Sequence, residues 1–171
     1  EIISEVFELF SPDIPIKKLP TQYIGFSPEH KGFAGTISLS SNLITSMVKE
    51  VGGQLSEMGF KRLILINGHG GQISLLNTAA RELRSIAPGM AVFPCFLWSG
   101  VNGLNELLTK TEIEDGLHAS LAETSLMLAL KPELVGDERP NEGIKGHIPE
   151  GWSLEGNAPT AWLTDDFSKS G

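Results

Sequence analysis

A histidine enclosed by glycines is the position in this sequence best suited to chemistry. His69 stands in the segment 67–71 (NGHGG), directly after the short apolar run 62–67 and directly before a predicted helix. Ligands of open parallel sheets bind beyond the carboxyl ends of the strands, which is where such a turn lies. Glycines let the backbone bend sharply and leave room for the close approach of an ion or a substrate. We therefore predict that His69 faces a binding crevice and that Gly70 borders the substrate.

Two other interpretations of this turn remain open. Glycines ahead of a helix can present backbone N–H groups to a phosphate. The segment 68–73 (GHGGQI) has neither the G-x-G-x-x-G spacing nor the lysine of a P-loop, which weakens this interpretation. In the third interpretation the glycines only form a tight turn between a strand and a helix, and His69 has no chemical role.

A second group of polar residues lies in the segment 115–125 (DGLHASLAETS). Ser120 and Glu123 have the S-x-x-E spacing of a capping box, in which each side chain accepts a hydrogen bond from a backbone N–H group at the start of a helix. This arrangement explains Glu123 without any chemistry, but it leaves His118 unexplained. If Glu123 points inward instead, it could share one site with His118 from the preceding loop.

Three further polar positions are more simply explained as exposed to solvent. Glu29 and His30 are neighbours in the sequence, so they need not face the same way, and a surface pair is expected. His147 lies in a loop rich in glycine and proline, where a solvated side chain is expected. The pair Asp165 and Asp166 is typical of a solvated turn.

Composition excludes several classes of protein. The 171 residues carry 13 Lys and Arg against 21 Asp and Glu, a net charge of −8, which argues against a nucleic-acid partner because phosphate backbones require a basic face. The single cysteine, Cys95, excludes a disulfide framework and a cysteine-based zinc cluster, so any metal must be held by histidine and carboxylate. No apolar run has the roughly 18 residues of a membrane helix, and no signal peptide opens the chain. We expect a cytoplasmic protein with no membrane partner.

Helical and extended patterns alternate along the chain. The expected helices span residues 41–58, 72–86 and 120–130, and the expected strands span residues 14–23, 62–67 and 90–98. The first strand contains Pro15 and Pro20, which restrict it to the edge of a sheet. This alternation predicts an α/β fold, a three-layer α/β/α arrangement with a mostly parallel sheet, in a single domain over residues 1–171.

Three segments, in this order, resemble the creatininase family of metal-dependent amidohydrolases. They are residues 23–40 (YIGFSPEHKGFAGTISLS), 59–72 (GFKRLILINGHGGQ) and 118–135 (HASLAETSLMLALKPELV). The resemblance implies that His69 is a ligand of a divalent metal pair and that Glu123 completes the metal site. It also implies that His118 acts on the substrate and that Ser27 lies near the substrate pocket.

The sequence departs from the family pattern in two places. Family members carry an earlier Gly-x-x-Glu-x-His-Gly segment followed by an aspartate, and nothing upstream of Glu29 corresponds to it, so we expect an interior part of a chain of about 230 to 260 residues. Members that act on creatinine have bulkier residues, including a glutamate, in place of Gly70 and Gly71, which counts against creatinine as substrate. A catalytic zinc needs about three protein ligands. Because His69 and Glu123 provide two, we expect this sequence alone to bind metal weakly.

The implied activity is hydrolysis of a non-peptide C–N bond in a small amide, a cyclic amide or a formamide. The metal, zinc with manganese or iron as alternatives, would activate water for attack on a carbonyl. His118 would stabilise the oxyanion or protonate the departing nitrogen, and Glu123 could share in proton transfer. Trp98 and the adjoining segment 100–117 would form a lid that selects the substrate.

Two other functions are weighed against this one. A non-catalytic binding or assembly subunit would retain the fold without a competent metal site, and a peptidase-like family member would trim a modified peptide. The resemblance also implies a homo-oligomer, in the form of a hexamer.

Overall fold

The computed structural model of the chain describes residues 2–116, 118–138, 151–152 and 159–166. Its residues divide into two compact units, and each is described here by itself. The sheet unit comprises Gln22–Val101 and Gly143–Lys169, and the helical unit comprises Glu1–Thr21, Asn102–Glu142 and Ser170–Gly171. The single domain expected over residues 1–171 remains a prediction.

The sheet unit is built around two parallel strands. Strand β1 (Arg62–Asn67) pairs with β2 (Ala91–Phe96) in a register that runs from Arg62 opposite Ala91 to Asn67 opposite Phe96. Helix α3 (Ile73–Ile86) connects them, since parallel strands need a crossover of this length. The α/β fold with a parallel sheet is therefore confirmed.

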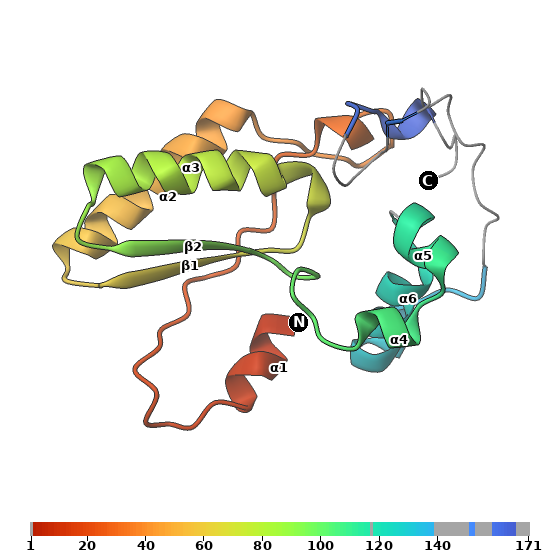
Figure 1. Cartoon of the computed structure of the whole chain (residues 1–171), viewed down its shortest axis with the longest axis horizontal. Helices are drawn as coiled ribbons and strands as arrows, with labels where there is room; N and C mark the ends of the chain where they lie inside the picture. The colour runs from red at the N-terminus through yellow and green to blue at the C-terminus, as the bar shows by residue number, and fades with distance from the viewer. Residues whose placement is uncertain (1, 117, 139–150, 153–158, 167–171) are drawn as a thin grey trace. The chain divides into compact units, whose positions relative to one another are not determined.

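Two helices cover one face of this sheet. Helix α2 (Ser41–Glu57) and α3 lie on the same side of the strands (Figure 1). Together they enclose an apolar core in which Leu83 and Met90 are fully buried. The other buried core residues are Ile44, Val48, Leu76, Ala79 and Ala87, and Leu63, Leu65 and Val92 of the strands pack against them.

The opposite face of the strands is exposed within the described residues of the sheet unit. Successive side chains of a strand point to opposite faces, so Leu63 and Leu65 enter the core while Ile64 and Ile66 face away. Ile64 and Ile66 are each 49% exposed, and Phe93 of β2 is 44% exposed. The apolar run 62–67 suggested cover on both faces, and the described residues supply it on one.

Local signals fix the ends of α2. The hydroxyl of Ser40 accepts a hydrogen bond from the backbone N–H of Leu43 at 3.2 Å, which caps the first turn. Gly59 follows the helix with a φ of 96°, a left-handed conformation that glycine adopts without strain. The expected helix over residues 41–58 is confirmed to within one residue.

The helices of the helical unit are short, as far as its described residues show. They are α1 (Ile2–Glu8), α4 (Leu104–Leu107), α5 (Lys110–Asp115), α6 (Leu121–Leu130) and the 3-10 turn η3 (Pro132–Leu134). The sheet unit adds the 3-10 turns η1 (Pro28–His30), η2 (Gly70–Gln72) and η4 (Thr164–Asp166). Among the described residues, no helix has both the length and the apolar character needed to cross a membrane.

The edge strand predicted over residues 14–23 is wrong. These residues form neither a strand nor a bridge. Pro15 and Pro20 lack the backbone N–H that a ladder requires, and the N–H of Ile16 is used locally, in a bond to the carbonyl of Ile14 at 2.7 Å. The apolar residues of this stretch were thus a misleading signal of sheet structure.

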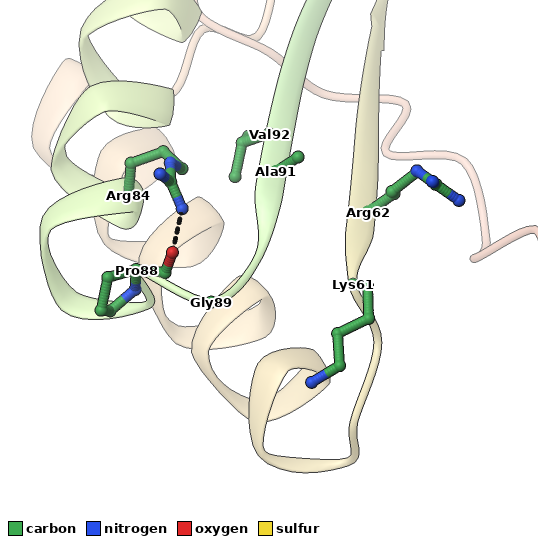
Figure 2. A pocket seen from close by; sticks show the side chains of 7 residues that line it. All are labelled: Lys61, Arg62, Arg84, Pro88, Gly89, Ala91 and Val92. Carbon is green, nitrogen blue, oxygen red and sulfur yellow. Dashed lines mark hydrogen bonds between the residues drawn. The ribbon is translucent and has the colours of Figure 1, made fainter.

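A basic hollow lies at the amino ends of the two strands, away from the turn that carries His69. It has a volume of about 630 Å³, and Lys61, Arg62 and Arg84 are among its lining residues (Figure 2). The three cationic side chains splay apart rather than meeting at one point (Figure 2). Arg84 donates hydrogen bonds to the carbonyls of Pro88 at 2.5 Å and Met90 at 2.7 Å. Its role is therefore to tie the turn between α3 and β2.

Candidate metal centre

The carboxyl end of β1 places His69. The strand ends at Asn67, and His69 precedes η2 in an extended conformation with φ −127° and ψ 119°. The buried side chain of Asn67, 3% exposed, accepts the backbone N–H of His69 through Oδ1 at 2.9 Å. This bond fixes the backbone of the turn, and His69 lies beyond the carboxyl end of β1, as its position in the sequence predicted.

A second loop brings a glutamate and another histidine to the same place. Pro28 opens the 3-10 turn η1, where its fixed φ suits the first position of a helical turn. Glu29 and His30 follow within that turn, and Glu29 is only 9% exposed. A carboxylate is rarely buried to this degree without partners.

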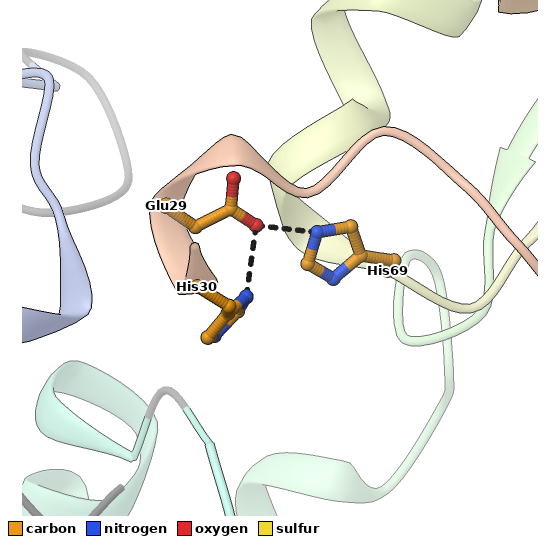
Figure 3. A group of neighbouring side chains, drawn as sticks. All are labelled: Glu29, His30 and His69. Atoms are coloured by element: carbon orange, nitrogen blue, oxygen red, sulfur yellow. Dashed lines mark hydrogen bonds and ion pairs between the residues drawn. The ribbon is translucent and has the colours of Figure 1, made fainter. Parts of the chain in front are cut away.

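The partners of Glu29 are the two histidines and a serine. Its Oε1 lies 2.5 Å from Nε2 of His69 and 3.2 Å from Nδ1 of His30 (Figure 3). The Ser27 hydroxyl donates to the same oxygen at 3.1 Å and lies 2.7 Å from Nδ1 of His30. Three side chains from two loops thus converge on one carboxylate oxygen of Glu29.

The pKa of Glu29 reflects this environment. Burial raises the pKa because it removes water from the charged form. A backbone hydrogen bond, the charge of His69 and the hydrogen bonds from Ser27 and His69 oppose this effect and together outweigh it. The pKa of Glu29 therefore lies below its usual value, and the carboxylate is ionised at neutral pH.

Gln72 ties the two loops together. Its Oε1 accepts the backbone N–H of Phe26 at 3.2 Å, ahead of η1, and its Nε2 donates to Oδ1 of Asn67 at 3.0 Å, at the end of β1. Since Asn67 also holds His69, one chain of hydrogen bonds connects the loop carrying Glu29 to the turn carrying His69. Coupled polar groups of this kind rigidify a site.

The donor set suits a divalent metal ion. Glu29, His30 and His69 each offer one ligand atom, and these atoms lie within 4.8 Å of one another. Tetrahedral ligands at about 2.1 Å from zinc are about 3.4 Å apart. Oε1 of Glu29 lies 2.5 Å from Nε2 of His69 and 3.2 Å from Nδ1 of His30. To reach the zinc spacing, the first distance would have to widen by about 0.9 Å and the second by about 0.2 Å. One carboxylate and two imidazoles also match the ligands of catalytic zinc.

One prediction from the sequence is corrected here. Glu29 and His30 are not a pair of solvated surface side chains, because Glu29 is buried and the partly buried His30 contacts its carboxylate from the next position of a tight turn. Weak metal binding was expected from two ligands, His69 and Glu123. The structure places two further candidate ligand atoms, from Glu29 and His30, beside His69, and the metal affinity itself remains a prediction. The proline after Ser27 was the one local signal of that turn, and neither periodicity nor spacing connects it to His69.

The other predicted site residues of the sheet unit lie in loops of that unit. Ser27 joins the cluster directly, through Glu29. Gly70 borders open space, since a Cβ there would meet nothing within 4 Å. Trp98 is half-buried in the turn that follows β2, and so lies beyond the carboxyl ends of the two parallel strands, as His69 does. The substrate contacts assigned to these three residues remain predictions.

The acidic pair near the end of the chain is exposed, in η4. Asp165 lies close to Gly32, where an added Cβ would come within 2.6 Å of its Oδ2. Asp166 accepts the backbone N–H of Leu163 at 2.8 Å. His147, the other residue expected in solvent, lies outside the described residues.

In the helical unit, Glu123 takes part in helix capping. Its backbone N–H donates to the Ser120 hydroxyl at 3.5 Å, and its carboxylate accepts the N–H of Ala119 at 2.7 Å. Ala119 has a φ of 47°, an uncommon conformation for a residue with a Cβ. His118 is exposed beside it. The metal-binding role of Glu123 and the catalytic role of His118 remain predictions, because the two units are not placed relative to each other.

Relatives of known name share much of this chain. Mycofactocin precursor peptide peptidase of Mycobacterium tuberculosis (strain CDC 1551 / Oshkosh) is 31% identical over 146 residues, which are 82% of this chain and 52% of that protein. Creatinine amidohydrolase of Pseudomonas putida is 30% identical over 135 residues, 71% of this chain and 52% of that protein. 3-Dehydro-scyllo-inosose hydrolase of Thermotoga maritima is 30% identical over 152 residues, 82% of this chain and 48% of that protein.

A solved structure and a family model agree with these relatives. The structure of a creatininase variant superposes with a TM-score of 0.54 at 27% identity, over 74% of this chain and 55% of the other. The chain spans about half the length of the curated relatives it matches. The family model described as creatinine amidohydrolase matches residues 2–171. The chain belongs to the creatininase family.

Proposed function

We propose that the whole protein is a hydrolase that depends on a divalent metal ion. The observation that carries this proposal is the convergence of Glu29, His30 and His69, whose ligand atoms lie within 4.8 Å of one another, in a creatininase-family chain. The relatives described above are named an amidohydrolase, a peptidase and a hydrolase, which supports the same reaction class.

The chain's own residues would prepare this site for the metal. When bound, the ion supplies Lewis acidity and makes water a better nucleophile at neutral pH. Glu29, ionised because of its lowered pKa, supplies negative charge to bind the cation. Ser27 orients Glu29 by donating to its Oε1, and Asn67 orients the backbone of His69. Partners of this kind fix the geometry of ligands and raise metal affinity.

The substrate we propose is a small amide, a cyclic amide or a formamide, cleaved at a non-peptide C–N bond. The name of the Pseudomonas relative supports an amide. The open space beside Gly70 leaves room for a small molecule next to His69. Trp98 and the segment 100–117 would select among such substrates. Zinc is the metal we propose, with manganese and iron as alternatives, since histidine and carboxylate ligands accept all three.

A peptidase acting on a modified peptide is the second candidate. It is favoured by the mycobacterial relatives, which are named as peptidases of a precursor peptide and are up to 31% identical to this chain. A panel of formamides, cyclic amides and short peptides, assayed with the full-length enzyme, distinguishes the two. Turnover of peptides alone would favour the peptidase and contradict the small-amide substrate.

His118 and Glu123 have proposed roles that are tested separately. His118 would protonate the departing nitrogen, since an imidazole titrates near neutral pH. Glu123 would bind the metal through Oε1, since Oε2 accepts the N–H of Ala119. Full-length His118→Ala is expected to lose most of its turnover while keeping its metal, and unchanged turnover would remove the role of His118.

We further propose a cytoplasmic homo-oligomer, a hexamer, whose mass would be measured by light scattering.

A non-catalytic subunit is the rival class. It predicts purified full-length protein without metal and without hydrolysis of any substrate in the panel. The hydrolase predicts metal in the purified protein, loss of turnover after chelation, and recovery when zinc or manganese is restored. Turnover that survives complete removal of metal would contradict the proposal.

A further inference from the structure

Of the glycines around His69, only Gly71 lies where a side chain would collide with the site. A Cβ at Gly71 would stand 2.7 Å from Nε2 of His69 and 2.8 Å from Cδ of Glu29, and closer still to Oε1 of Glu29. Real Cβ atoms essentially never approach other atoms within 3.0 Å. A Cβ at Gly68, on the other side of His69, would meet nothing within 4 Å.

The requirement for glycine at position 71 is therefore steric rather than conformational. Gly71 does not belong to the glycines with positive φ, so its backbone suits any L-residue. What occupies the space of its missing side chain is the Glu29 carboxylate at Nε2 of His69 (Figure 3). The two groups compete for one position.

Glu29 has little freedom to move aside. Its carboxylate is 9% exposed and is held by Nε2 of His69 at 2.5 Å, the Ser27 hydroxyl at 3.1 Å and Nδ1 of His30 at 3.2 Å. A Cβ at position 71 would lie beside the contact between Glu29 and His69, too close to both Oε1 and Nε2 for the two side chains to keep their present places. A methyl group at this position would therefore push the Glu29 carboxylate, the His69 imidazole or both out of the positions that they hold.

We propose that Gly71 is a positioning residue of the metal centre, which admits the Glu29 carboxylate to the position beside His69. This inference rests on the proposed function, in that the carboxylate admitted is a proposed metal ligand. It also makes a claim about the metal-free protein: substitution at position 71 acts through Glu29. Once Glu29 is shortened, the remaining close contact is with Nε2 at the far end of the His69 side chain, which can move into the space that Glu29 leaves, so the substitution becomes nearly neutral.

A double-mutant cycle tests this claim. The variants are Gly71→Ala, Glu29→Ala, the double variant, and Gly68→Ala as a matched glycine-to-alanine control. Zinc affinity would be measured by competition with a chromophoric chelator, and thermal unfolding would be measured on the metal-free proteins. In the protein that retains Glu29, we expect Gly71→Ala to weaken zinc binding at least tenfold. In the Glu29→Ala background, the same substitution should change zinc affinity less than twofold. The control Gly68→Ala should also change it less than twofold.

Unfolding keeps this inference separable from the proposed function. If the wild type binds no zinc, the proposed function fails. The inference would still require Gly71→Ala to lower the melting temperature of the protein that retains Glu29, and to leave the melting temperature of the Glu29→Ala protein unchanged. Should Gly71→Ala alone fail to fold, the double variant is expected to fold like Glu29→Ala. The inference is overturned if Gly71→Ala behaves like Gly68→Ala, or if its effect is the same in both backgrounds.

Discussion

Gln72 offers the sharpest test of how the two loops are held together. Truncation in Gln72→Ala removes the acceptor of the Phe26 N–H at 3.2 Å and the donor to Asn67 Oδ1 at 3.0 Å, both in a partly buried setting. A net contribution of about 1 kcal/mol for each hydrogen bond gives a loss of about 2 kcal/mol in the free energy of unfolding. For a chain of this length, that loss lowers the melting temperature by about 4–8 °C.

The assay is thermal and urea unfolding of the metal-free protein. Gln54→Ala is the matched control, because Gln54 is exposed on α2 and its truncation should change the unfolding free energy by no more than about 0.5 kcal/mol. In Gln72→Glu the side chain still accepts from Phe26 but places an acceptor against Asn67 Oδ1, so at least half of the loss should remain. The proposed link between the two loops through Gln72 is refuted if Gln72→Ala is as stable as Gln54→Ala.

Two further predictions concern stability. Gly52→Ala should lower the free energy of unfolding by about 1–3 kcal/mol, because a Cβ there would crowd the buried side chain of Leu83, lying 3.1 Å from its Cγ and nearer its methyl groups. Its neighbour Gly53 has open space, so Gly53→Ala should raise stability by about 0.5–1 kcal/mol in the same urea titrations, and equal effects at both positions would contradict this packing. The lowered pKa of Glu29 predicts that its carboxylate stabilises the metal-free fold above the pKa of the unfolded chain and that this contribution disappears as pH falls through the folded pKa. The difference in unfolding free energy between wild type and Glu29→Gln should therefore shrink as the pH is lowered from about 5 to about 3, whereas a difference that grows over this interval would be incompatible with it.

Elements with strong local signals were predictable from the sequence. The run RLILIN became β1, and the repeat of apolar residues over 41–58 became α2, with the Ser40 cap and the terminal Gly59 marking its ends. In each case the signal lies within a few residues of the element that it specifies. The position of His69 after β1 could be read for the same reason.

The rest of the site depends on contacts between distant residues. Glu29 and His69 are 40 positions apart, and Gln72 reaches Phe26 across 46 positions, so no periodicity reports either contact. Neighbouring residues at 29 and 30 would diverge in a strand, and only the tight turn η1 lets both reach one centre. The apolar stretch 14–23 misled in the opposite way, since its composition suggested a strand, whereas its two prolines each remove a donor and it forms no strand.

The most direct test of the metal centre is an anomalous difference map at the zinc absorption edge from crystals of the zinc-loaded protein. We predict one peak about 2.0–2.2 Å from Oε1 of Glu29, Nδ1 of His30 and Nε2 of His69. The matching map from His69→Ala crystals should lose that peak. A zinc peak elsewhere, or one that persists unchanged without the His69 imidazole, would contradict the account.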